Sequence, residues 1–263
     1  MGIMDSIKAA VGIGGAKIRI RIDNEENIRQ GGHLCGQVIL QGGKVEQKLT
    51  NLTLRIQLDK SYDSTAINAE KGHSAANEII HALIVAESQM IRPGEEYAFD
   101  FQMDISENAP ISTDTVCWQI KAIADIPAAM DSVSTVIFKV KPSAAQMAFD
   151  QAMLKLGYAS QDLDNDLDTG SLYAEYEPIQ THNSIFSMLN CDFQNRDGDL
   201  HVEFTLIPEE DRLISLMESL MEEDENFPDL VLPCSSIFPD HDQNYPDLEY
   251  ILGRIQEIFN RLK

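Results

Sequence analysis

Alternation of apolar and polar side chains predicts a β-rich first half. Near the start of the chain, three isoleucines alternate with Lys17, Arg19 and Arg21, and residues 97–105 alternate in the same way. This period of two places the apolar side chains on one face of a strand and the polar ones on the other. About seven such segments precede residue 140, with turns and no convincing helix between them, so an immunoglobulin-like β-sandwich is expected over 1–140.

The period changes near residue 141 and predicts a short helix. Ser143 and Gln146 have the spacing of a capping box, and Gly157 stands where a left-handed residue would end the helix. We therefore expect residues 141–157 to form a helix that connects two domains.

The residues that follow predict a second β-rich domain over 158–245. Three segments have the pattern of strands, and Asp197 with Gly198 supplies a tight turn between the last two. An acidic segment, 209–225, carries leucine and methionine at helical spacing and is expected to pack on the sandwich. The chain as a whole is thus predicted to be mainly β, with two sandwich domains in tandem.

An amphipathic helix is expected over 246–263. Its apolar face includes Ile251, Ile255, Ile258 and Phe259. Such a stripe must be buried, either within the same molecule or against a partner protein or a second copy. The pattern alone leaves both alternatives open.

Composition narrows the functional classes. The chain has 263 residues, with 20 Lys and Arg against 43 Asp and Glu, so its net charge is −23. Nucleic-acid binders neutralise phosphates with basic residues, so nucleic acid is not an expected partner. No apolar run is long enough to span a membrane, and the four cysteines are widely separated. We expect free thiols and a cytoplasmic protein.

An alternating aspartate run suggests one candidate metal site. Asp164, Asp166 and Asp168 lie at alternate positions, and Glu175 falls at the twelfth position of a calcium loop that begins at Asp164. The turn glycine of such a loop is replaced by Thr169. Two interpretations remain open: a solvated acidic loop, or a ligand-binding module that uses calcium or binds sugars. No motif for catalysis or for a cofactor is present, so neither is expected.

The basic residues Lys17, Arg19 and Arg21 form one face of the first predicted strand. Charges on an edge strand prevent unwanted pairing with other sheets. They could equally dock an acidic partner. Both interpretations are kept.

Four strings resemble the bacterial SpoOM sporulation-control family, which belongs to the arrestin-like group. They are IRQGGHLCGQVILQGG with the following KVEQKLTNLTLRIQL, IRPGEEYAFDFQMDI, VCWQIKAIADIPAAMD, and the helix ending LGY. The resemblance covers roughly residues 1–160. It implies tandem arrestin-like domains and a non-enzymatic regulatory or scaffolding protein that binds other proteins, with no catalytic residues.

Overall fold

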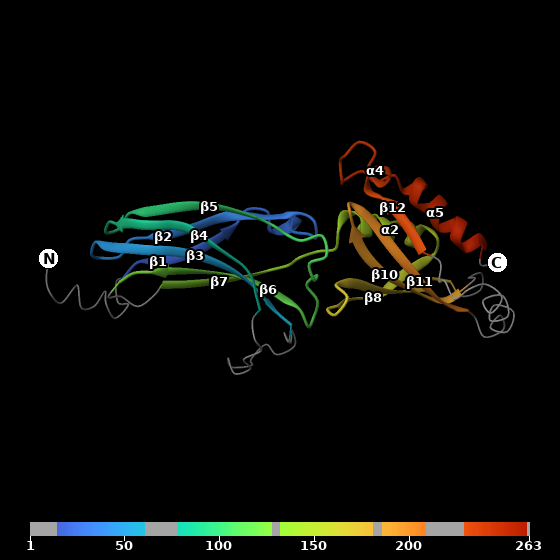
Figure 1. The fold of residues 1–263 in the computed structure, drawn as a ribbon, viewed down its shortest axis with the longest axis horizontal. Coiled ribbons are helices and arrows are strands. Elements are labelled where there is room, and N and C mark those ends of the chain that lie inside the picture. Colours follow the sequence, from blue (N-terminus) through green and yellow to red (C-terminus); the bar gives the residue numbers. More distant parts are fainter. Residues whose placement is uncertain (1–14, 61–77, 128–131, 181–185, 209–228, 262–263) are drawn as a thin grey trace. The chain divides into compact units, whose positions relative to one another are not determined.

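The chain divides into two compact units (Figure 1). The computed structural model describes residues 15–60, 78–127, 132–180, 186–208 and 229–261. Unit 1 consists of the described residues up to Ile105 together with Ser112–Lys141, and unit 2 consists of Ser106–Ile111 together with the described residues from Pro142 onward.

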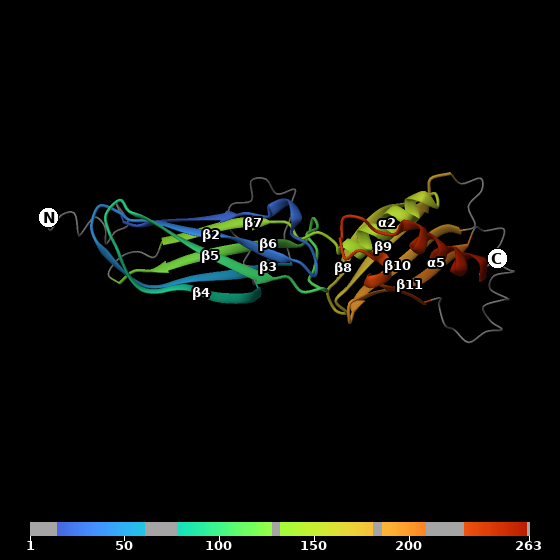
Figure 2. The same ribbon diagram turned by 90° about the horizontal axis from the view of Figure 1, so that it is seen from above.

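Unit 1 is a sandwich of two antiparallel sheets (Figure 2). One sheet has the order β1-β2-β5 and the other the order β4-β3-β6-β7. The elements are β1 (Lys17–Ile22), η1 (Glu25–Asn27), β2 (His33–Gln41), β3 (Gln47–Asp59), β4 (Glu78–Ile91), β5 (Glu96–Asp104), β6 (Cys117–Asp125) and β7 (Ser132–Phe138). The predicted sandwich is therefore confirmed in this part of the chain.

Alternation along the strands fills the core of unit 1. Leu54 and Ile56 of β3 face inward and are buried, as are Trp118 and Ile120 of β6. Trp118 packs against Phe138 with 6.0 Å between the ring centroids. The residues that alternate with these buried ones along β3 and β6 point outward. They form the outer face of the β4-β3-β6-β7 sheet.

Unit 2 has one sheet, with its second layer made of helices. The antiparallel order is β12-β11-β10-β9-β8. The elements are α2 (Ala144–Lys155), β8 (Tyr158–Asp166), β9 (Ser171–Pro178), β10 (Phe186–Arg196), β11 (Asp199–Pro208), β12 (Asp229–Pro233), α4 (Cys234–Ile237) and α5 (Leu248–Arg261). The chain is mainly β, as predicted, but the described part of unit 2 does not contain the two facing sheets expected of a second sandwich. Apolar side chains of α2 and α5 cover the sheet instead.

Helix α2 belongs to the core of unit 2 and is not a simple connector. The Ser143 hydroxyl accepts a hydrogen bond from the Gln146 backbone N–H at 3.2 Å, as the capping pattern predicted. Gly157, which follows the helix, has φ +88°. Between these ends, Phe149 is fully buried and contacts Phe193 with 5.2 Å between the ring centroids. Because the apolar face of α2 is buried in this core, residues 142–157 belong to unit 2.

The segment Ser106–Ile111 also belongs to unit 2, although the sequence placed it inside the first domain. The side-chain amide of Asn165 binds both sides of the Ile111 backbone: its oxygen accepts from the Ile111 N–H at 2.7 Å and its nitrogen donates to the Ile111 carbonyl at 3.0 Å. Asn108 binds the Asn195 backbone in the same two-sided way, at 2.8 and 2.9 Å. The Ile111 side chain is buried in the core of unit 2.

The predicted acidic helix over 209–225 lies outside the described residues. Among the helices that the structure describes, none combines the length and the apolar character needed to cross a membrane.

Candidate functional site

The aspartate run that suggested a calcium loop is a β-hairpin. Asp164 and Asp166 lie in β8, Asp168 lies in the turn, and Glu175 lies in β9. The Asp166 carboxylate accepts hydrogen bonds from the backbone N–H groups of Asp168 at 2.9 Å and Thr169 at 3.2 Å. A hydrogen bond with the Thr169 side chain and these backbone bonds lower the pKa of Asp166. Its carboxylate therefore stabilises the turn.

The hairpin spreads the candidate ligands along two strands. Asp164 lies opposite Tyr173, and Glu175 lies opposite Asp162. A calcium loop instead bends its carboxylates around one point. Within the described ranges, no group of three or more His, Cys, Asp or Glu side chains is arranged to hold a metal ion. The structure thus does not bring Asp164, Asp166, Asp168 and Glu175 together.

Acidic side chains line up across the outer face of this sheet. We call Asp229, Glu203 and Asp192 the acidic row, because Glu203 of β11 lies directly opposite Asp229 of β12 on one side and Asp192 of β10 on the other. The row continues to Tyr173 of β9 and Asp164 of β8. Like charges in directly opposite positions of a sheet destabilise the pairing of its strands.

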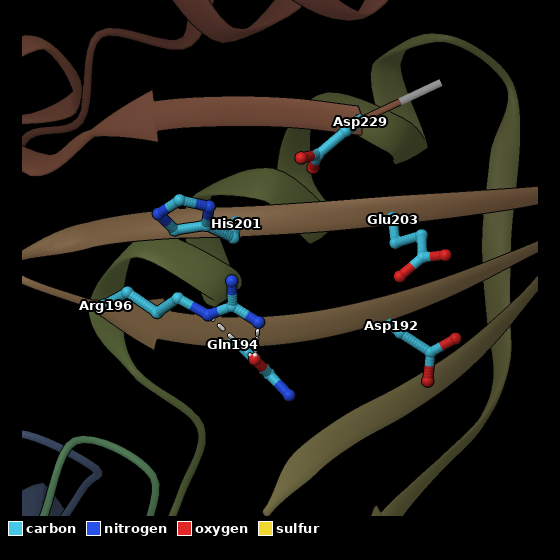
Figure 3. Close-up of a pocket in the computed structure, with 6 residues that line it drawn as sticks. All are labelled: Asp192, Gln194, Arg196, His201, Glu203 and Asp229. Carbon is cyan, nitrogen blue, oxygen red and sulfur yellow. Dashed lines mark hydrogen bonds between the residues drawn. The ribbon is translucent and has the colours of Figure 1, made fainter. Parts of the chain in front are cut away.

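A shallow polar hollow of about 110 Å³ surrounds the acidic row (Figure 3). Besides the three carboxylates, its lining consists of Gln194, Arg196 and His201. Arg196 donates through its Nε to the Gln194 Oε1 at 2.9 Å, and through its Nη2 to the same oxygen. Figure 3 shows this pair at one end of the hollow, with Asp192 and Glu203 toward the other.

The hollow differs in size and lining from a typical site for a small molecule. Sites for small molecules usually enclose about 300–1,000 Å³ and have largely apolar walls. The lining here is polar and contains no Ser, Thr, Cys or Lys that could act as a nucleophile. Burial raises the pKa of Asp192, and the nearby carboxylates of Glu203 and Asp166 raise it further. The dominant property of this face is therefore concentrated negative charge.

The substitution Glu203→Gln should make the stability of unit 2 less dependent on pH. The folded state raises the pKa of Asp192 above its unfolded value, so folding is favoured most when this group is protonated. Stability is consequently lost as the pH rises from about 4 to 7, and removing the Glu203 charge should reduce that loss. Urea unfolding at both pH values measures the effect. Glu177→Gln, on the same sheet outside the row, is the control, and an equal gain at both pH values would contradict the explanation.

The basic residues of β1 are exposed, and two of them have nearby acidic partners. Arg19 pairs with Glu96 at 2.9 Å and Arg21 with Asp23 at 2.8 Å, while Lys17 lies exposed at the start of the strand. Among the strands that the structure describes, β1 pairs with β2 alone and is therefore an edge strand. This arrangement fits the interpretation that charge protects the edge of the sheet.

The apolar residues of the C-terminal helix are not available to a partner. Ile251 and Ile255 are fully buried, and Ile258 and Phe259 are each 6% exposed. The Phe259 ring contacts Phe186 and Tyr158 with 5.5 and 5.9 Å between the centroids. Of the two alternatives that the sequence left open, the structure shows burial within the same molecule, because these four residues complete the core of unit 2.

The most unusual edge strand is β4, whose position the sequence did not reveal. Among the described strands it pairs with β3 alone, so its other side is an edge of the sheet. Ile79, Ile80, Ile84 and Met90 are 50%, 47%, 52% and 49% exposed. The strand contains no Lys and no Pro, the residues that commonly protect an edge.

Comparison with solved structures finds a similar fold that covers most of the chain. The crystal structure of Spo0M, a sporulation control protein from Bacillus subtilis, matches with a TM-score of 0.64 and 19% identity, covering 95% of this chain and 100% of that one. The DNA glycosylase AlkC of Pseudomonas fluorescens matches with a TM-score of 0.29 and 14% identity, over 51% of this chain and 34% of that one. A family 123 glycoside hydrolase of Clostridium perfringens matches with a TM-score of 0.29 and 12% identity, over 49% and 27%.

The two weaker matches carry no information on function, because their scores are too low. No curated protein matches the chain. The family described as SpoOM protein matches residues 4–218, which is most of the sequence and includes parts of both units. The chain belongs to the SpoOM protein family.

Proposed function

We propose that this protein is a non-enzymatic cytoplasmic regulator or scaffold that controls its pathway by binding other proteins, and that the edge of β4 is a binding element. Membership of a sporulation-control family supports a regulatory role. The small volume and the polar walls of the hollow in unit 2 support a role without catalysis in that unit.

The observation that carries the proposal is the exposed apolar edge of β4. An unpaired edge offers backbone N–H and C=O groups to which an extended peptide adds as a further strand. β4 runs over 14 residues, which is long for a strand, and its only charged residues are Glu78 and Glu87. β1, by contrast, is basic at every second position. A long edge with only two charged side chains is costly for a protein that does not use it.

Two interruptions limit where a partner strand can pair. The register between β3 and β4 shifts between Leu52 and Thr53 and again between Ile56 and Gln57. Ile80 is passed over at the second shift and is 47% exposed. A charge introduced at Ile80 should therefore affect the edge more than the pairing with β3.

Photo-crosslinking from position 80 in cells of the source organism should capture a partner, which is then purified for hydrogen exchange. We expect the partner to protect backbone amides of β4, and Ile80→Lys to weaken binding by about tenfold. Leu154→Lys, at a 56% exposed position in α2, is the matched control. A partner that leaves the β4 amides unprotected, or that binds both variants equally, contradicts the proposal.

A further inference from the structure

We propose that the outer face of the β4-β3-β6-β7 sheet is a second docking surface, and that its partner is an acidic amphipathic segment of another protein. This inference goes beyond the β4 edge, because it concerns the side chains on the face of the sheet and the chemistry of what covers them. The strand register, the charges and the exposure of this face carry the argument.

A cationic row crosses the middle of this face. Arg55 of β3 lies directly opposite Lys121 of β6. Arg55 is exposed and Lys121 is half-buried, and neither side chain has a hydrogen-bond or ion-pair partner in the part of the chain that the structure describes. Like charges at directly opposite positions repel each other and weaken a sheet. In a chain with a net charge of −23, two adjacent unpaired cations suggest that an anionic group is meant to lie between them.

On both sides of the cationic row lie rows that contain exposed isoleucine or valine together with uncharged polar residues. On one side, Thr53 of β3 lies opposite Ile84 of β4 and Ile123 of β6, and Ile123 lies opposite Val133 of β7. Ile84 is 52% exposed and Val133 is 49% exposed.

On the other side, Gln57 lies opposite Ile79 and Gln119, and Gln119 lies opposite Ile137. Ile79 is 50% exposed and Ile137 is 56% exposed. Four large apolar side chains are thus about half exposed on one sheet face. Exposed apolar side chains that lie side by side, as Ile123 and Val133 do here, mark sites of interaction.

The three rows define the chemistry of the partner. Alternate residues of a strand lie about 7 Å apart, so each flanking row lies about that far from the cations. A partner segment that fits this face has a carboxylate between two apolar side chains, each about 7 Å from it. Alternate residues of an extended peptide provide this spacing, and so do residues about one turn apart on a helix.

Nucleic acid fits this face poorly. Phosphate backbones are bound through many cations, whereas this row offers two, and the flanking rows carry no charge. The acidic composition of the whole chain also repels a polyanion, whereas a short acidic segment needs to approach only this face. Complementarity of both charge and hydrophobicity therefore favours an acidic polypeptide.

A synthetic helical peptide that is rich in Glu and carries Ile, Glu and Met about one turn apart on one face is a suitable probe. Its sequence differs from that of residues 209–228, because the chain itself is acidic there and the test concerns a segment of another protein. The control peptide carries Gln and Asn in place of every Glu and Asp. Binding of the labelled peptides to the full chain is measured by fluorescence anisotropy at low and high salt.

We expect the acidic peptide to bind, with an affinity that falls about tenfold in the double variant Arg55→Glu, Lys121→Glu and also falls at high salt. The double variant Lys17→Glu, Arg21→Glu, on the other sheet, should bind as the original protein does. The milder variant Arg55→Gln, Lys121→Gln guards against misfolding, with circular dichroism as the check. Ile80→Lys should leave peptide binding unchanged. The proposal for this face and the proposal for the β4 edge can therefore be contradicted separately.

Three binding results overturn the proposal. The acidic peptide fails to bind the original protein, or the amide peptide binds equally well, or the Arg55 and Lys121 variants bind as tightly as the original. Sedimentation velocity tests whether a second copy of the chain covers this face. A change of oligomeric mass in the Arg55 and Lys121 variants would assign this face to a second copy of the chain and would also overturn it.

Discussion

Replacing Phe149 with alanine should lower the free energy of unfolding of unit 2 by about 3–5 kcal/mol, the range for a large aromatic residue removed from a core. The Phe149 side chain has no exposed surface. Its ring lies within 6.1 Å, centroid to centroid, of Tyr176, Phe193 and Phe204 on three neighbouring strands. Truncation leaves a cavity where α2 meets the sheet, and the rigid strands around it cannot close the space.

The single tryptophan makes this prediction specific to one unit. Trp118 is buried in unit 1, so its fluorescence follows the unfolding of that unit, while circular dichroism follows both. In Phe149→Ala we expect an earlier circular-dichroism transition with an unchanged fluorescence transition. Leu154→Ala, an exposed position on the same helix, should change neither. A shift of the tryptophan signal equal to that of circular dichroism would show that the two units unfold together and would contradict the expected separation.

Replacing Ile255 with alanine should cost about 2–5 kcal/mol and leave the oligomeric mass unchanged. Ile255 lies at the centre of the apolar stripe of α5 and is fully buried in unit 2. The stripe serves the same molecule, so shortening this side chain should weaken folding and not association. Urea unfolding followed by circular dichroism measures the first quantity and sedimentation velocity the second.

Gln256→Ala provides the comparison for α5, because the neighbouring Gln256 is exposed. Its effect on stability should be small. If Ile255→Ala reduced the oligomeric mass while the unfolding curve stayed in place, the helix would have to be reassigned to an interface between copies.

The sequence predicted the elements of unit 1 well because burial there has a period of two. Leu54 and Ile56 of β3 face the core, and the polar residues between them face outward. β8 was missed because most of its residues are polar or acidic, and its existence depends on pairing with β9. Local propensity does not contain that information, since a partner strand decides it.

The candidate binding surfaces were harder to predict from the sequence than the fold. The apolar character of β4 is visible in the sequence, but its position at an edge follows from the strand order of the whole sheet. Arg55 and Lys121 are far apart along the chain and become neighbours only through the register of β3 and β6. The stripe of α5 was recognised correctly, but only the core of unit 2 shows where it is buried.

The placement of Ser106–Ile111 in unit 2 has a consequence for how this architecture can be inherited. The residues on both sides of this segment belong to unit 1, so the chain passes from one unit to the other three times. A gene fragment ending at Lys141 would separate Ile111 from Asn165, and Asn108 from Asn195. Recombination at a single junction cannot exchange one unit intact, and we therefore expect the two to have evolved as a linked pair.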